Sequence, residues 1–198
     1  MLTIAVEDRI SEAVAAKVAN LVCGDKFGTQ TIVGHGYGGL KKRMSAFRAI
    51  AQTRPVWLLT DLDRVLCPSV LITNWTGGTA LPEKLCFRVA VREIEAWLLA
   101  DREAMAELLG LSVAKIVKDP EAIGDPKEYL LNLARQAKNR NIRSELVPKK
   151  GTTASQGFGY NPVLCEFVTS KWSPERASDA SRSLAKAMTR LSELLQRQ

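Results

Sequence analysis

Two aspartates at the end of an apolar segment have the residue types and spacing of metal ligands. Asp61 and Asp63 follow Pro55–Thr60, whose sequence PVWLLT predicts a strand buried on both faces of a sheet. In an extended segment, residues two apart point to the same side, so both carboxylates should project together from the strand's end. Two neighbouring carboxylates favour a hard cation such as Mg²⁺. The alternative is that one Asp caps the next helix and the other is solvated.

Further acids follow two other predicted strands. Glu7 comes directly after Leu2–Val6, and Glu93 and Glu95 come after residues 85–91. Carboxyl ends of parallel strands meet at one edge, so the sequence predicts an acidic cluster suited to phosphoryl chemistry with Mg²⁺ or Mn²⁺. Each Glu could instead stabilise the first turn of a helix. Glu93 and Glu95 would lie about 200° apart on a helix, so only one of them should face the site.

The elements that position these acids alternate along the first half of the chain. Thr29–Val33 predicts one more strand, and apolar residues at helical spacing predict helices over residues 8–23, 40–52 and 92–109. This alternation predicts an α/β fold with an open, doubly wound, mainly parallel sheet and flanking helices.

The second half of the chain has the pattern of helices. Residues 125–137 and 173–198 each begin with a capping residue followed by Pro, which predicts a helix start, and residues 149–160 predict an exposed loop. We therefore expect residues 1–110 to form the α/β core and residues 111–198 to pack on it as a helical extension, in a single compact unit. Leu184, Met188, Leu191 and Leu195 form a stripe at helical spacing, which either joins the core or docks onto a partner.

A glycine-rich segment lies between the second strand and the next helix. Residues 34–39, GHGYGG, match the G-x-G-x-x-G pattern of dinucleotide-binding loops, but they occupy the second strand–helix unit and continue into Lys41, Lys42 and Arg43. The segment therefore predicts either contact with phosphate through backbone N–H groups or a plain turn. His35, the single histidine, lies in this turn and is not expected to be catalytic.

Charge favours an anionic partner. The chain has 28 Lys and Arg against 21 Asp and Glu, a net charge of +7, and two basic groups that could contact a nucleic-acid backbone, Lys41–Lys42–Arg43 and Lys149–Lys150. The four cysteines are far apart and predict free thiols rather than a zinc site. The sequence starts without a secretory signal and contains no apolar run long enough to span a membrane, so we expect a cytoplasmic protein.

Several motifs resemble a known family. A Glu after the first strand and D-x-D after the third resemble the TOPRIM domain of topoisomerases, primases and OLD-type nucleases. VREIEAWLLAD (residues 91–101), DPKEYL (residues 125–130) and GYNPVLCEFV with KWSPERASDASRSL (within residues 159–184) are similar to a prokaryotic TOPRIM-like family of unknown function. Members of that family are often encoded beside ATPases in phage-defence loci.

The resemblance implies a TOPRIM-like fold and a role for each acid. Glu7 would be the general acid or base, Asp61 and Asp63 catalytic Mg²⁺ ligands, and Glu93 or Glu95 an added ligand. One position departs from the pattern, because TOPRIM domains have Gly after the first Glu and this chain has Asp8.

Two hypotheses of different classes follow. The first is a Mg²⁺-dependent nuclease, or a related phosphoryl-transfer enzyme, that acts on nucleic acid in a phage-defence system with an ATPase partner. The second is a non-catalytic TOPRIM-like binding subunit that docks onto such an ATPase through its C-terminal helix.

Overall fold

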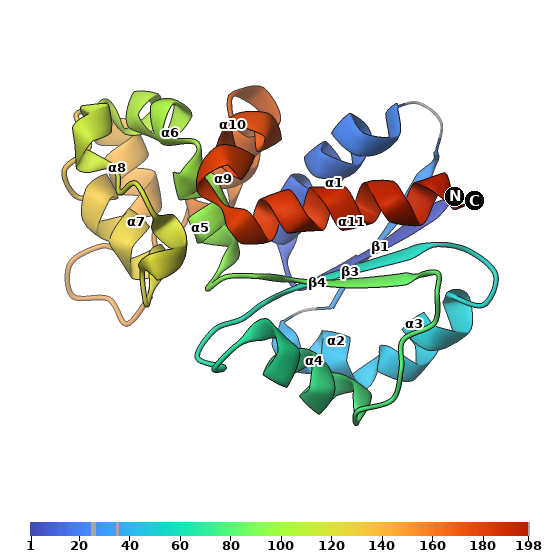
Figure 1. The fold of residues 1–198 in the computed structure, drawn as a ribbon. Helices are drawn as coiled ribbons and strands as arrows, with labels where there is room; N and C mark the ends of the chain where they lie inside the picture. Colours follow the sequence, from blue (N-terminus) through green and yellow to red (C-terminus); the bar gives the residue numbers. More distant parts are fainter. Residues whose placement is uncertain (25–26, 35, 198) are drawn as a thin grey trace.

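The centre of the fold is a parallel sheet. The computed structural model describes residues 1–24, 27–34 and 36–197, and within them four strands pair in the order β2-β1-β3-β4 (Figure 1). The strands are β1 (Leu2–Val6), β2 (Thr29–Val33), β3 (Val56–Asp61) and β4 (Leu85–Ala90). All four lie within one residue of the predicted ranges, so the α/β class and the parallel sheet are confirmed, and the layout is Rossmann-like.

The two central strands are apolar because both of their faces are covered. Every residue of β1 is buried, as is every residue of β3 except Asp61 at its end. The edge strand β4 instead alternates buried and half-buried residues over Leu85–Val89. This difference explains why β1 and β3 have unbroken apolar sequences.

Three short helices cover one face of the sheet. They are α2 (Tyr37–Lys42), α3 (Met44–Ile50) and α4 (Pro68–Thr76). Figure 1 shows these helices together below the sheet. Leu40, Phe47 and Leu71 from these helices pack in one cluster with Leu58 of β3 and Phe87 of β4. The alternate residues of β4 therefore face the opposite side of the sheet.

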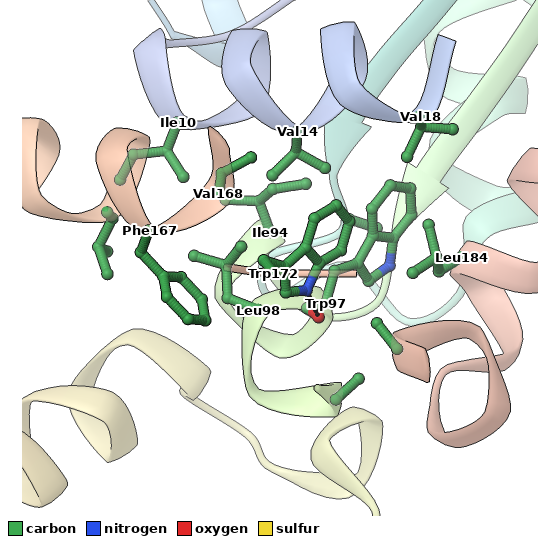
Figure 2. Close-up of a cluster of buried hydrophobic side chains, with 14 of the residues drawn as sticks. Ile10, Val14, Val18, Ile94, Trp97, Leu98, Phe167, Val168, Trp172 and Leu184 are labelled. Atoms are coloured by element: carbon green, nitrogen blue, oxygen red, sulfur yellow. Dashed lines mark hydrogen bonds between the residues drawn. The ribbon is translucent and has the colours of Figure 1, made fainter. Parts of the chain in front are cut away.

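The other face is covered by α1 (Arg9–Cys23) and by helices from the second half of the chain. Val14 and Val18 of α1 pack with Trp97, Trp172 and Leu184, and Figure 2 shows these side chains together. The indole Nε1 of Trp172 donates a hydrogen bond of 3.0 Å to the carbonyl oxygen of Trp97. The helices of this layer that contact α1 are α9 (Tyr160–Ser170) and α11 (Arg182–Gln196). Next to them, α10 (Pro174–Ala180) packs on α11 and on α5 (Ile94–Ala100).

The remaining elements extend this layer beyond the sheet. They are α6 (Arg102–Leu109), the 3₁₀ helices η2 (Val113–Lys115) and η3 (Pro120–Ala122), α7 (Pro126–Ala134) and α8 (Arg140–Leu146). Leu109, Leu130 and Leu146 from this part belong to the same buried cluster as Val14 of α1. The cluster draws residues from both sides of the predicted boundary at residue 110, which stays a prediction.

Three predicted helices are each two helices in the structure. Residues 40–52 are interrupted at Arg43, which separates α2 from α3, and residues 173–198 are interrupted at Ser181, which caps α11. Residues 92–109 are interrupted at Asp101, whose side chain accepts hydrogen bonds from Ala104 N (3.3 Å) and Ser173 N (2.8 Å). Contacts with distant segments therefore override helical spacing. The structure also adds α4, α8 and α9, which the sequence analysis did not predict.

The stripe on the C-terminal helix belongs to the core. Leu184 and Leu191 have no exposed surface, Leu195 is buried, and Met188 packs against the same cluster. This stripe is therefore not available for docking onto a partner. The four cysteines are free thiols, and no helix in the described ranges is long and apolar enough to cross a membrane.

Candidate functional site

The candidate site lies where the order in which the chain adds strands to the sheet reverses. From β1 the chain first adds β2 on one side and later adds β3 on the other, so the carboxyl ends of β1 and β3 border the switch point at which open α/β sheets bind ligands. Glu7 immediately follows β1 and Asp61 is the last residue of β3. The topology therefore places two of the predicted acids at this point.

Glu7 is held by the end of the neighbouring strand. Its Oε1 accepts a short hydrogen bond from the hydroxyl of Thr60 and one of 3.1 Å from the backbone N–H of Asp61. Burial raises the pKa of the Glu7 carboxyl, these two donors lower it, and the nearby Asp63 and Asp8 raise it again, so that it lies above the usual range. Glu7 is therefore oriented by direct contacts toward β3.

Asp61 lies among several other carboxylates. Its pKa is raised well above the usual range by burial first, and then by the charges of Glu95, Glu7, Asp8 and Asp63. Each of these acids makes ionisation of Asp61 more costly, since like charges at short range disfavour one another. The charges that act on Asp61 therefore belong to residues that follow β1, β3 and β4.

Asp63 does not follow the predicted geometry. The backbone at Asp63 turns into the left-handed region with φ of 49°, and Leu62 is buried with 2% of its surface exposed. The N–H groups of Leu62 and Asp63 each donate to the carbonyl oxygen of Arg92 at 2.9 Å, which ends the extended strand. The expectation that Asp61 and Asp63 belong to one extended segment is therefore wrong. Asp63 as a whole residue is exposed. Its carboxyl group is nevertheless partly buried, which raises its pKa, and the charge of Arg64 opposes this shift.

Glu93 and Glu95 take different places. Glu93 is the residue before α5, and its Oε2 accepts a hydrogen bond of 2.9 Å from Lys127 N at the start of α7. Glu95 lies in the first turn of α5 with 5% of its surface exposed, and its Oε1 accepts a hydrogen bond of 2.8 Å from the hydroxyl of Tyr160. Burial raises the pKa of Glu95 to about 7, with Tyr160 opposing and Glu93 adding to the shift. Glu95 is the one whose charge acts on Asp61.

Two clefts flank the acids. One, of about 470 Å³, is lined by Glu7, Asp8, Gly36 and Asn161 among others. The other, of about 540 Å³, is lined by residues that include Tyr37, Asp63, Glu93 and Asp125. Glu7 and Asp8 therefore border the first cleft and Asp63 and Glu93 the second, whereas Asp61 and Glu95 line neither of them.

The glycine-rich segment is shaped by close backbone contacts. A Cβ on Gly39 would lie 1.7 Å from the carbonyl oxygen of Gly34, so no other residue fits there without a shift. The N–H groups of Gly34 and Gly36 donate to the carbonyl oxygens of Val6 (2.8 Å) and Glu7 (3.0 Å). These bonds fasten the loop to the end of β1. His35 lies outside the described residues.

The predicted nucleic-acid contacts form two separate groups. Lys41, Lys42 and Arg43 are exposed at the end of α2, on one face of the sheet. Lys149 and Lys150 are exposed between α8 and α9, and α9 packs on α1 over the opposite face (Figure 1). The two groups therefore belong to different elements, and their contact with nucleic acid stays a prediction.

Thr60, Tyr160 and Tyr37 are site residues that the sequence analysis missed. Thr60 precedes Asp61 directly, so its place at the end of β3 was a usable sequence signal. Tyr160 lies 65 residues after Glu95 in the chain, and no pattern links them. Asp8 accepts a hydrogen bond of 2.8 Å from Ser11 N as the N-cap of α1.

The donor chemistry of the site fits a divalent cation. Carboxylate oxygens are the ligands that Mg²⁺ prefers. The pKa of Asp61 is raised by burial first and by the neighbouring acids second. Within the described ranges, no three His, Cys, Asp or Glu side chains are arranged to hold a metal ion. The charge and ligand type are therefore suitable, whereas the side chains are not preassembled.

Comparison with known proteins adds no relative: no family model, no curated protein and no solved structure matches this chain. The fold and the site define it as a Rossmann-like α/β protein with a group of coupled carboxylates at the switch point of its sheet.

Proposed function

We propose that this protein is a TOPRIM-like, Mg²⁺-dependent nuclease or related phosphoryl-transfer enzyme that acts on nucleic acid. The observation that supports it most is the coupling of Asp61 to Glu7, Asp63 and Glu95, which come from the ends of three strands. Acids at these positions are what the resemblance to TOPRIM domains implies. Several ionisable groups with raised pKa values close together are also typical of catalytic sites.

Each acid has a role that its contacts favour. Asp61, Asp63 and Glu95 would hold the cation, and Glu95 would do so through Oε2 because its Oε1 accepts the hydrogen bond from the hydroxyl of Tyr160. Glu93 is the less suitable ligand because it is not among the charges that raise the pKa of Asp61, whereas Glu95 is. Glu7 is fixed by Thr60 and the Asp61 N–H, and as the general acid or base it exchanges a proton with the reacting oxygen. When bound, Mg²⁺ supplies charge stabilisation at a phosphoryl oxygen and an activated water.

Metal binding is the first property to test, because it requires neither substrate nor partner. Thermal unfolding is followed across a Mn²⁺ or Mg²⁺ titration in the wild type and in Asp61→Asn. A ligand that binds only the folded state raises its stability by mass action, so the wild type should show a saturable increase in Tm. Asp61→Asn should lose this increase, and it should be more stable than the wild type without metal because one like charge is removed.

Asp179→Asn is the matched control, since Asp179 is an exposed acid on α10, away from the switch point. It should retain the metal response. Equal titration curves for the wild type and Asp61→Asn would refute the metal site, and the non-catalytic binding subunit would become the better explanation. If the metal response is confirmed, cleavage of DNA and RNA is assayed with Mg²⁺, and Asp63→Asn should abolish cleavage while nucleic-acid binding persists.

A partner protein belongs to the same proposal. The resemblance implies an ATPase encoded nearby, and the burial of the α11 stripe means that such a partner would use another surface. Addition of that ATPase should then increase metal-dependent cleavage without changing the loss in Asp63→Asn.

A further inference from the structure

A small pocket beside the edge strand β4 gathers positive charge. It has a volume of about 200 Å³ and lies between α4 and the start of α11, with Pro68 and Ile72 on the α4 side. Arg88 of β4 and Arg182 and Lys186 of α11 line it, and Glu121 is its acidic residue. Figure 1 shows α11 running along β4. The pocket's charged side chains thus sum to three cations and one anion.

Arg88 is a partly buried cation that forms no ion pair with the described residues. Its Nε is buried and has no hydrogen-bond partner among the described residues. Burial lowers the pKa of the Arg88 guanidinium, and the nearby Arg190 lowers it further. Cys86 cannot offset this charge at neutral pH, because burial raises the pKa of its thiol to about 11. A buried charge without a partner is costly, so an anion in the pocket would be favoured.

The single acid of the pocket is already engaged. Glu121 Oε1 accepts hydrogen bonds from the hydroxyl of Ser181 (2.6 Å) and from Ser183 N (2.7 Å), at the start of α11. The ion pairs present in the described ranges include none with Arg88, Arg182 or Lys186. The three cations are therefore available to a ligand.

We propose that this pocket binds a phosphate group. A phosphate dianion matches an excess of positive charge better than a carboxylate does, and its oxygens can accept from two guanidinium groups and an ammonium at once. The volume is several times the roughly 30 Å³ share of one water molecule, which leaves room for a phosphate with part of its ester group. The proposal does not rest on the metal site.

The place of the pocket relates it to the switch point. Ala90 of β4 pairs with Asp61 of β3, and Arg88 lies two residues earlier. With about 3.3 Å per residue and about 4.8 Å between strands, the Cα atoms of Arg88 and Asp61 are about 8 Å apart. A phosphate in the pocket could therefore belong to a ligand that also reaches the acids.

The test measures phosphate binding directly. Inorganic phosphate is titrated by calorimetry and by thermal unfolding, in EDTA and at an ionic strength held constant with NaCl, since screening alone changes stability. The wild type should bind saturably. Arg88→Met, which keeps an apolar stem of similar length, and Lys186→Gln should each weaken binding by about tenfold or more, because a charge-assisted contact is lost.

A matched control separates the pocket from general charge. Lys118→Gln removes one cation from an exposed position outside the pocket and should bind phosphate like the wild type. Lys186 is exposed, so Lys186→Gln should fold normally even if Arg88→Met does not. Unchanged binding in Lys186→Gln and Arg88→Met, or no saturable binding by the wild type, would overturn the proposal.

Two oligonucleotides identify the source of the phosphate. A short oligonucleotide is offered with and without a 5′-phosphate, in competition with inorganic phosphate. Displacement by both forms would indicate a backbone phosphodiester, whereas displacement by the 5′-phosphorylated form alone would indicate a terminal phosphate group. Displacement by neither, with saturable binding of the ion, would indicate free phosphate.

Discussion

Substitution of Glu95 by Gln should reduce the dependence of stability on pH. Glu95 is buried with 5% of its surface exposed, and its pKa is raised from 4.5 to about 7 by burial above all. Gln has nearly the same shape, and its carbonyl oxygen can still accept the hydrogen bond from the hydroxyl of Tyr160. The substitution therefore removes the titration while it preserves the packing.

The sign follows from proton binding in the two states. Between pH 4.5 and about 7, folded Glu95 keeps its proton while the unfolded chain has released it. Its contribution to stability is thus complete below pH 4.5 and is lost as the pH rises through 7. The difference between the two pKa values corresponds to about 3 kcal/mol in the free energy of unfolding. Asp61, whose pKa is also raised, adds a loss in the same direction.

The assay is urea-induced unfolding at pH 5 and pH 8, with EDTA present to exclude divalent cations. From pH 5 to pH 8, the free energy of unfolding should fall by about 3 kcal/mol less in Glu95→Gln than in the wild type. The difference between the two proteins becomes somewhat larger than this if Asp61 is also easier to ionise in the variant. Glu166→Gln makes the same change at an exposed position of α9 and should follow the wild type. The reasoning is refuted if Glu95→Gln and the wild type show the same pH dependence.

Two further substitutions test the frame around the site. Gly39→Ala should destabilise the protein by about 1–3 kcal/mol, because its Cβ would overlap the carbonyl oxygen of Gly34. Gly38→Ala has open space around its Cβ and should cost little. Equal free energies of unfolding for the two variants would contradict this reasoning. Asp101→Asn should lower the free energy of unfolding by about 3 kcal/mol, because the buried carboxylate, with 1% of its side chain exposed, accepts a hydrogen bond from Arg176 Nη2 at 2.7 Å. The measurement is urea-induced unfolding. A loss below about 1 kcal/mol would show that the guanidinium is hydrated instead.

The strands were predictable because their signal is local. Apolar runs such as residues 56–60 are bounded by polar residues and Pro, and both the ends and the parallel pairing followed from the alternation with helices. Helix breaks were not predictable in the same way. Asp101 interrupts a segment with good helical spacing because it accepts hydrogen bonds from Ser173, 72 residues away. Only the folded chain brings that partner into contact.

The candidate site was partly predictable for the same reason. The position of Glu7 and Asp61 at strand ends follows from topology, since parallel strands end at one edge. The backbone turn at Asp63 does not, because it depends on the carbonyl oxygen of Arg92 from another segment. The hydrogen bond between Tyr160 and Glu95 also joins distant segments, so the sequence offered no indication of which Glu faces Asp61.

The position of α11 has a consequence for synthesis on the ribosome. The helix covers one face of a sheet that is built from residues 2–90, and Leu184 and Leu191 fill the core against Val18 of α1. At about 5–20 residues per second, roughly 5–20 s pass between translation of β4 and that of α11, during which this apolar face lacks its cover. Slower elongation over residues 91–181 would lengthen this interval, so the nascent chain should depend on chaperones most strongly there.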